Sequence, residues 1–461
     1  MAKLVLQVSL PRRIKNSLKD LLGERVCFQE EDLLAYSYDA SGIQALPEAV
    51  CFPERVEEVA SLLRLAWEER IPVVPRGAGS STTGSAVAVR GGLVISSARL
   101  NRILEISPLD LLAVVEPGVV VADLDRALAQ VGLFYPPDPA SLAFATIGGN
   151  IATCAGGPRG LKYGVTRDYV LSLEIVLADG TVVEVGRRTA KSVVGYDLTR
   201  LLVGSEGTLA FITKATLKVL PRPESRSVCL AAFKSPFEAV AALNTLLSAG
   251  VLPRTAEFLD DLTISGIAQR LPPGFSSARA LLILELDGSR EAVASDLQRL
   301  KKTLSPARIF VAGDQQEEET IWAARRAISP ALRQLRPHKR GEDIVVRRSR
   351  LAELVSLVIR LRERHRLPIA SFGHAGDGNL HVNILFDARD PGERDRAEKA
   401  RRDLFSGVLE LEGTISGEHG IGLTKMLYLP QEVSPPALSL MKGIKKVFDP
   451  REILNPGKIF S

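Results

Sequence analysis

Cysteine is scarce and scattered in this chain of 461 residues. The four cysteines are Cys27, Cys51, Cys154 and Cys229, and no two of them form a C-x-x-C pair. Their spacing excludes an iron–sulfur cluster, a zinc ribbon and a secreted disulfide framework. We therefore expect the protein to work in a reducing compartment.

Long apolar runs and strong net charge are also missing. The short apolar stretch Leu4–Leu10 ends at Pro11-Arg12-Arg13 without a small-residue cleavage site, and no later run approaches transmembrane length. We expect a cytoplasmic protein, with peripheral attachment to the inner face of the membrane as the alternative. A net charge of +5 is weak for this length, so no nucleic-acid partner is expected. The densest basic run, residues 333–350, includes acidic and apolar residues, and we interpret it as a solvated edge.

Hydrophobic periodicity predicts an α+β protein whose two parts differ in the length of their helices and strands. The first part has short elements, including a helix over 56–67, a strand over 71–75 and a hairpin around Asp179-Gly180. The second part has longer helices and strands, predicted over 237–249, 281–286, 290–304, 309–312, 318–335, 351–365, 369–372 and 380–385. The proline-rich residues 221–223 mark the predicted boundary. We expect a domain over 1–222 with N-terminal helices and two α/β lobes from about 43, a second domain over 223–413, and a segment over 414–461 that returns to the first.

Two glycine-rich stretches in the first part suit the binding of phosphate groups. Residues 75–84 read Pro-Arg-Gly-Ala-Gly-Ser-Ser-Thr-Thr-Gly, and glycine is dense again over 148–164. Glycine lets backbone N–H groups approach phosphate oxygens, and hydroxyl side chains add donors. Thr82 stands where a Rossmann fingerprint needs glycine or alanine, and no Walker A spacing occurs. Either stretch alone also fits simple tight turns, but the two together favour a large phosphorylated cofactor.

Three of the five histidines fall in two compact motifs. His374 and His381 flank Asp377-Gly378, a two-residue turn signal that predicts directly opposed histidines with Cβ atoms ~4.5–5.5 Å apart. Two imidazoles at that separation can reach one metal ion. Glu418-His419 lies among glycines that can turn both side chains inward. Two histidines and a carboxylate suit Zn²⁺, Fe²⁺ or Mn²⁺; the alternative is that the histidines only hydrogen-bond locally and that 418–419 is a surface turn.

Over nearly the whole chain these motifs resemble a known group of flavoenzymes. Residues 75–81, 136–150, 204–209 and 454–458 resemble the FAD-binding module of the vanillyl-alcohol oxidase and p-cresol methylhydroxylase (PCMH) superfamily. The histidine motifs resemble those of FAD-linked D-2-hydroxyacid dehydrogenases, the group of D-lactate dehydrogenases, D-2-hydroxyglutarate dehydrogenases and the catalytic subunit of glycolate oxidase. The resemblance implies a two-lobed PCMH-type FAD-binding domain and an α+β cap domain with an antiparallel sheet flanked by helices.

The resemblance also implies how FAD is bound. Covalent members carry a flavin-linked histidine in the first loop, and Ser80 stands in the matching neighbourhood, so non-covalent FAD is expected. The implied FAD-binding residues are Pro75, Arg76, Gly77, Ala78, Gly79, Ser80, Ser81, Gly84, Pro137, Asp138, Ser141, Thr146, Gly148, Gly149, Asn150, Gly156, Glu206, Gly207, Ile212 and Asn455.

In that group the residues matching His374, His381 and Glu418 hold a divalent metal, and the residue matching His419 is the base. This assignment suits hydride loss from an alcohol carbon, which is assisted when a base near neutral pKa takes the hydroxyl proton and a cation stabilises the alkoxide. The hydride would pass to the flavin N5. The implied reaction is oxidation of a small 2-hydroxy acid, such as D-lactate or glycolate, to the 2-oxo acid; the D preference comes from the resemblance alone.

Binding of the acid calls for a cation that can pair with its carboxylate. Arg325 resembles the arginine that binds the substrate in the catalytic site of this group. Arg326 is only one position away and could take this role instead. The alternative for either arginine is a charge on the surface of a helix. Lys339 and Asn383 are further candidate substrate contacts, and Arg340 could replace Lys339 in that role.

Reduced flavin must pass its electrons on, and the sequence has no cluster or haem motif of its own. We expect an iron–sulfur subunit, an electron-transfer flavoprotein or a quinone as acceptor. Three other readings remain open: a flavin oxidase that uses oxygen, a non-catalytic FAD-carrying electron-transfer subunit, and a metallohydrolase without flavin.

Overall fold

The computed structural model describes residues 10–460, so most of the apolar stretch Leu4–Leu10 lies outside the described residues. The chain divides into two compact units. The first comprises Met1–Ala155, Val165–Arg222 and Glu418–Ser461, and the second comprises Gly156–Gly164 and Pro223–Gly417. Over residues 10–460, no helix combines the length and the apolar character needed to cross a membrane.

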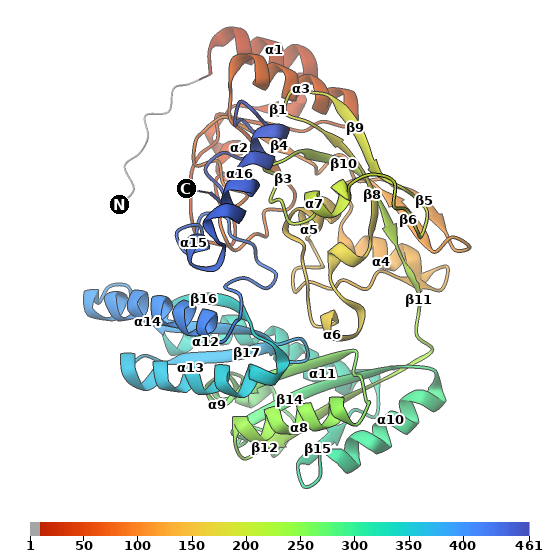
Figure 1. Cartoon of the computed structure of the whole chain (residues 1–461), viewed down its shortest axis with the longest axis vertical. Helices are drawn as coiled ribbons and strands as arrows, with labels where there is room; N and C mark the ends of the chain where they lie inside the picture. Colours follow the sequence, from red (N-terminus) through yellow and green to blue (C-terminus); the bar gives the residue numbers. More distant parts are fainter. Residues whose placement is uncertain (1–9, 461) are drawn as a thin grey trace. The chain divides into compact units, whose positions relative to one another are not determined.

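The first unit contains a four-stranded sheet in the order β1-β2-β4-β3 (Figure 1). Its strands are β1 (Val26–Cys27), β2 (Ala49–Cys51), β3 (Val73–Arg76) and β4 (Leu93–Ser96). Helices α1 (Arg12–Leu22) and α3 (Val56–Glu69) share one apolar core with this sheet. Ile14, Leu18 and Leu22 recur every four residues along α1, which places all three on its buried face. The predicted helix over 56–67 is confirmed as α3.

A five-stranded antiparallel sheet in the order β5-β6-β10-β8-β9 forms the other lobe of this unit. Its strands are β5 (Ile103–Ser107), β6 (Leu112–Val115), β8 (Val170–Val176), β9 (Val182–Gly186) and β10 (Phe211–Lys218). Smaller elements are α2 (Glu30–Leu34), α4 (Val121–Ala129), β7 (Leu133–Phe134), α5 (Ile147–Thr153), α7 (Leu198–Leu202), β11 (Leu220–Pro221), α15 (Leu429–Glu432) and α16 (Pro435–Phe448). The hairpin predicted around Asp179-Gly180 is confirmed as the β8–β9 pair.

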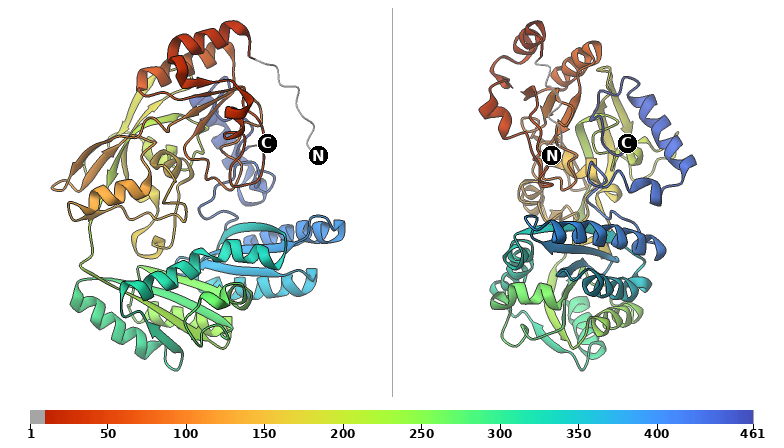
Figure 2. Two further views of the ribbon diagram at one scale, coloured as in Figure 1. Left: turned by 180° about the vertical axis from the view of Figure 1, so that it is seen from behind. Right: turned by 90° about the vertical axis from the view of Figure 1, so that its left-hand side faces the viewer.

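The second unit is a seven-stranded antiparallel sheet in the order β15-β12-β14-β13-β17-β18-β16. Its strands are β12 (Ser225–Phe233), β13 (Thr255–Asp260), β14 (Ala280–Gly288), β15 (Arg308–Val311), β16 (His338–Val345), β17 (Ile369–His374) and β18 (Asn379–Phe386). One face packs on α9 (Asp261–Ile267), α11 (Gln315–Arg326) and α12 (Ile328–Leu335). The other face carries α8 (Pro236–Ser248), α10 (Arg290–Thr303), α13 (Leu351–His365) and α14 (Pro391–Glu410), of which α13 and α14 lie side by side (Figure 2). The short helix α6 (Gly160–Tyr163) also belongs to this unit.

Two expectations for the second unit were wrong. The single helix expected over 318–335 is two helices, α11 and α12, because Pro330 has no N–H with which to continue the hydrogen-bond ladder across Ala327. The solvated edge expected over 333–350 contains the strand β16, in which Glu342 and Asp343 are only 2% and 0% exposed. These carboxylates can be buried because each has a partner: Arg401 pairs with Glu342, and N–H donors bond to Asp343.

Candidate functional site

The two predicted phosphate-binding loops meet in the first unit. A Cβ atom added to Gly77 would lie 2.3 Å from Oγ1 of Thr146, so only glycine fits at this close approach. Thr146 is the N-cap of α5, and its Oγ1 accepts a hydrogen bond from the backbone N–H of Gly149 at 3.3 Å. Stretches separated by some seventy positions in the sequence thus form one glycine-rich surface at the start of α5.

Buried polar side chains hold this surface in shape. The Arg76 guanidinium donates to the carbonyl oxygens of Ala86 (2.9 Å) and Tyr38 (2.8 Å). The Asn455 side-chain amide donates to the carbonyl oxygens of Ser85 (2.8 Å) and Glu206 (2.7 Å). Both predicted FAD-binding residues therefore organise the loops around them.

The first unit also offers an unpaired donor for a polar ligand. Asn150 is 3% exposed, and among the described residues its Nδ2 has no hydrogen-bond partner. A buried unpaired N–H group is costly and usually marks the place of a ligand or water. A Cβ atom at Gly148 would lie 2.6 Å from Cβ of Pro117, so this glycine too is needed for close packing. These residues fit a large polar cofactor such as FAD.

Nearly all the other predicted FAD contacts lie in the same unit. These are Pro75, Ala78, Gly79, Ser80, Ser81, Gly84, Pro137, Asp138, Ser141, Gly207 and Ile212. Gly156 is the exception, because residues 156–164 cluster with the second unit.

The hairpin that carries His374 and His381 has a different register from the predicted one. Its loop spans four residues, 375–378, and the strand partner of His381 is Phe372, so the predicted direct opposition of the two histidines was wrong. Gly378 has φ +87°, but it ends this longer loop and does not belong to a two-residue turn. His374 lies two residues from Phe372 and therefore on the same face as His381. The imidazoles are diagonal neighbours whose ring centroids are 5.1 Å apart.

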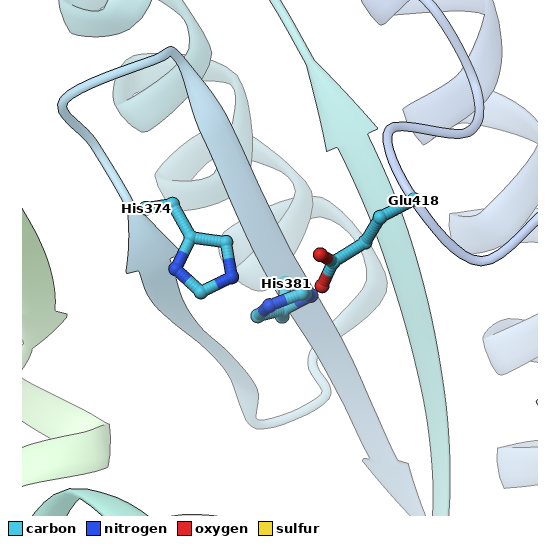
Figure 3. Close-up of side chains that lie close together, drawn as sticks. All are labelled: His374, His381 and Glu418. Atoms are coloured by element: carbon cyan, nitrogen blue, oxygen red, sulfur yellow. The ribbon is translucent and has the colours of Figure 1, made fainter. Parts of the chain in front are cut away.

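Glu418 completes a group of three side chains that could hold a metal ion (Figure 3). One donor atom from each of His374, His381 and Glu418 lies within 4.8 Å of the others. Bonds of about 2.1 Å to one metal keep any two donors within about 4.2 Å of each other, so small side-chain adjustments suffice. Two nitrogens and one carboxylate oxygen are a donor set that binds Zn²⁺, Fe²⁺ or Mn²⁺.

Glu257 connects this group to Arg325. It is fully buried on β13, where it pairs with His374 across the strands. Burial raises its pKa, but the charges of Arg325 and His374 outweigh burial and lower the pKa to about 2. The ionised Oε1 can only accept, so Nδ1 of His374 donates to it, and in the neutral imidazole, the form that binds metals, the Nε2 lone pair is left for a metal. Oε2 is 2.5 Å from both Nε and Nη2 of Arg325.

The three predicted substrate contacts lie on the same face of this sheet as the histidines. Arg325 is 13% exposed and stacks on Phe372 at 4.7 Å, whereas Arg326 is 56% exposed. Asn383 and Lys339 share the face of His381 by strand alternation and by the β16–β18 register. Burial, and secondarily Arg333, lowers the pKa of Lys339 to about 8.

His419 is held in the first unit by the glycine-rich turn that follows it. Its carbonyl oxygen accepts a hydrogen bond from Oγ1 of Thr83 at 3.3 Å. The carboxylate of Glu206 accepts from the N–H groups of Ile421 (2.7 Å) and Gly422 (2.9 Å). The His419 side chain is 29% exposed, so its imidazole is accessible.

Sequence reasoning missed Glu257 and Asp343. Glu257 lies in the strand Thr255–Asp260, which was not predicted, and Asp343 lies in the basic run that was taken for a solvated edge. A usable signal was present at Glu257, because a lone carboxylate beside apolar, β-prone residues is typical of a buried strand with a polar partner. Asp343 follows Glu342 within the basic run and gave no such signal.

Two protein-family models together match most of the chain. Residues 47–186 match the FAD binding domain, and residues 222–459 match the C-terminal domain of FAD linked oxidases.

Individual proteins are similar over more than nine tenths of the chain. The chain is 43% identical to glycolate oxidase subunit GlcD of Bacillus subtilis, covering 93% of this chain and 92% of that protein. It is 35% identical to a D-lactate dehydrogenase of Anaerostipes hadrus, covering 96% of each. The crystal structure of p-cresol methylhydroxylase with substrate bound has a TM-score of 0.81 at 19% identity, covering 97% of each chain, which shows a shared PCMH-type fold.

Proposed function

Since the chain belongs to the FAD-linked oxidases and is an FAD-binding oxidoreductase, we propose that it oxidises a small D-2-hydroxy acid to the 2-oxo acid. Glycolate and D-lactate are the first candidates, because the relatives named above are a glycolate oxidase subunit and a D-lactate dehydrogenase. We assign FAD to residues 1–222 together with 414–461, and recognition of the acid to the cap over 223–413.

The observation that carries this proposal is the grouping of His374, His381 and Glu418 next to an arginine held by Glu257. The three donors would hold a divalent cation. When bound, the cation would favour loss of the substrate hydroxyl proton, and FAD would supply the hydride acceptor. Glu257 supports the cation site by keeping the Nδ1 proton on His374.

Arg325 would bind the substrate carboxylate with one edge of its guanidinium. Glu257 occupies the Nε–Nη2 side, which leaves Nη1 and the outer hydrogen of Nη2 for a bidentate contact. Lys339, as a cation below pH 8, and the Asn383 amide would add contacts to the same carboxylate or to a longer side chain of the acid.

His419 would take the hydroxyl proton at its imidazole while the hydride leaves the α-carbon. Imidazole is the side chain that most often serves as a general base. Hydride transfer and proton loss together remove two electrons and two protons, and the alcohol becomes a carbonyl.

We propose that the electrons then pass to a partner protein, such as an iron–sulfur subunit or an electron-transfer flavoprotein, or to a quinone. Two points support a separate acceptor: the Bacillus relative is named as a subunit of glycolate oxidase, and the chain has no C-x-x-C pair. We expect a cytoplasmic location, with peripheral attachment to the inner face of the membrane as the alternative.

The test is anaerobic bleaching of the flavin by glycolate, D-lactate, L-lactate and D-2-hydroxyglutarate. We expect His419→Ala to retain FAD and metal and to reduce its flavin at least 100-fold more slowly, on the order of the general-base contribution. His365→Ala is the matched control, because His365 lies on α13 and pairs with Asp403. Wild-type bleaching rates in His419→Ala would refute the assignment of the base, and peroxide formed at the turnover rate in air would favour an oxidase.

A further inference from the structure

We propose that Asp343 is a positioning residue that fixes Glu418, the third metal ligand, against the hairpin of His374 and His381. This inference rests on the proposed function. Asp343 is 0% exposed on β16 and is the direct strand partner of His381. Its Oδ1 lies 3.9 Å from Nδ1 of His381, so this carboxylate adjoins the donor group.

The two oxygens of Asp343 accept hydrogen bonds from two different segments. Oδ1 accepts from the side-chain Nδ2 of Asn379 at 2.7 Å, and Oδ2 accepts from the backbone N–H of Gly417 at 2.8 Å. Asn379 begins β18, the strand that carries His381, and Gly417 directly precedes Glu418. One buried carboxylate therefore ties a histidine strand to the segment that presents the glutamate.

The same segment is held along β16 by its backbone. The N–H of Val345 donates to the carbonyl of Thr414 at 3.1 Å, and the N–H of Thr414 donates to the carbonyl of Val345 at 2.9 Å. Past this bridge the chain packs so closely that a Cβ atom at Gly417 would lie 2.6 Å from Cγ2 of Val345 and 2.8 Å from Nδ2 of Asn379. Only glycine can bring its N–H to Asp343 here. Because Glu418 directly follows Gly417, this contact fixes the position of the Glu418 backbone.

Asparagine is the informative substitution for Asp343. It has the same shape, but its NH₂ group would face an N–H donor from either Asn379 or Gly417, so one of the two contacts must open. A neighbour supplies the matched control. Glu342 is also buried on β16, but it projects to the opposite face and pairs with Arg401 at 2.6 Å.

The experiment measures the zinc affinity of the full-length protein with FAD retained, after its metal has been removed with a chelator. Competition with a chromophoric chelator gives the Zn²⁺ dissociation constant, and Co²⁺ reports ligand geometry through its visible spectrum. We expect Asp343→Asn to bind Zn²⁺ about 10–100-fold more weakly and to alter the Co²⁺ bands, as losses of ligand-orienting groups do. Glu342→Gln should stay within about threefold of wild type, and both variants should keep their FAD. Gly417→Ala should reproduce the loss with Asp343 intact.

A double variant tests whether Asp343 acts through Glu418. In a Glu418→Ala background, Asp343→Asn should cause no further loss of affinity beyond about twofold. Additive losses would instead make Asp343 an independent contributor and overturn the proposal, as would wild-type zinc binding by Asp343→Asn. His381→Ala distinguishes failure of the positioning role of Asp343 from failure of the proposed metal site. If this variant also binds Zn²⁺ like wild type, the proposed metal site itself is wrong.

Discussion

Replacing Glu257 with glutamine should destabilise the second unit strongly, because this carboxylate neutralises the buried Arg325 cation and accepts a hydrogen bond from His374. Glutamine keeps the volume and an acceptor for Nδ1 of His374. It loses the charge opposite Arg325, whose side chain is only 13% exposed. Removing one member of a buried ion pair typically costs about 3–5 kcal/mol.

The pKa gives an independent magnitude. A pKa of about 2 in the folded state against an ordinary value of 4.5 means that ionised Glu257 stabilises the fold by on the order of 3 kcal/mol near neutral pH. A depressed pKa in the folded state makes this contribution present above pH 4.5 and lost as the pH falls towards 2. The gap between wild type and Glu257→Gln should therefore shrink to less than half by about pH 3.

Tryptophan fluorescence can report this unit alone. The chain has two tryptophans, Trp67 in the first unit and Trp322 on α11 in the second, so a Trp67→Phe background isolates Trp322. Urea unfolding is then compared between pH 3 and 7. Glu319→Gln is the control, because its pair with Arg326 is exposed and should contribute less than about 1 kcal/mol. A Glu257→Gln transition within about 1 kcal/mol of wild type at pH 7 would refute the reasoning.

Three further predictions concern single residues. Lys339 loses its charge as the pH rises through about 8, so kcat/KM of the wild type should fall above that pH. In Lys339→Met, kcat/KM should be lower than in wild type and should not change around pH 8. A pH profile of kcat/KM checks both. Gly77→Ala should lower the FAD-to-protein absorbance ratio by forcing Thr146 aside, whereas Gly443→Ala, with nothing within 4 Å of the new Cβ, should not. Burial raises the pKa of Glu206 to about 7, so its protonated form is favoured in the folded state. FAD-free protein should therefore lose stability as the pH rises from 4.5 to 7. A Tm difference between wild type and Glu206→Gln that does not change over this pH range would contradict this.

Local sequence determined the parts of this protein that depend on near neighbours. Three local features could be predicted: the glycine-rich loop over 75–84, the helix at Val56–Glu69 and the β8–β9 hairpin. They depend on the backbone freedom of glycine and on the hydrophobic period, and both can be read from consecutive residues. The rarity of histidine was enough to single out His374 and His381 as candidates. Family resemblance added the FAD assignment.

Only the tertiary structure decided how the candidate residues meet. The Asp377-Gly378 signal predicted a hairpin but gave the wrong register, since β17 is also paired with β13 and the loop takes four residues. The structure distinguishes Arg325 from Arg326 by the buried Glu257, which comes from a distant strand.

Asp343 shows the same limit, because its proposed positioning role depends on a hydrogen bond to Gly417, 74 positions away in the sequence. From the sequence alone, a carboxylate in a basic run is indistinguishable from a solvated one. Burial and hydrogen-bond partners belong to contacts between distant segments, and the fold alone brings those segments together.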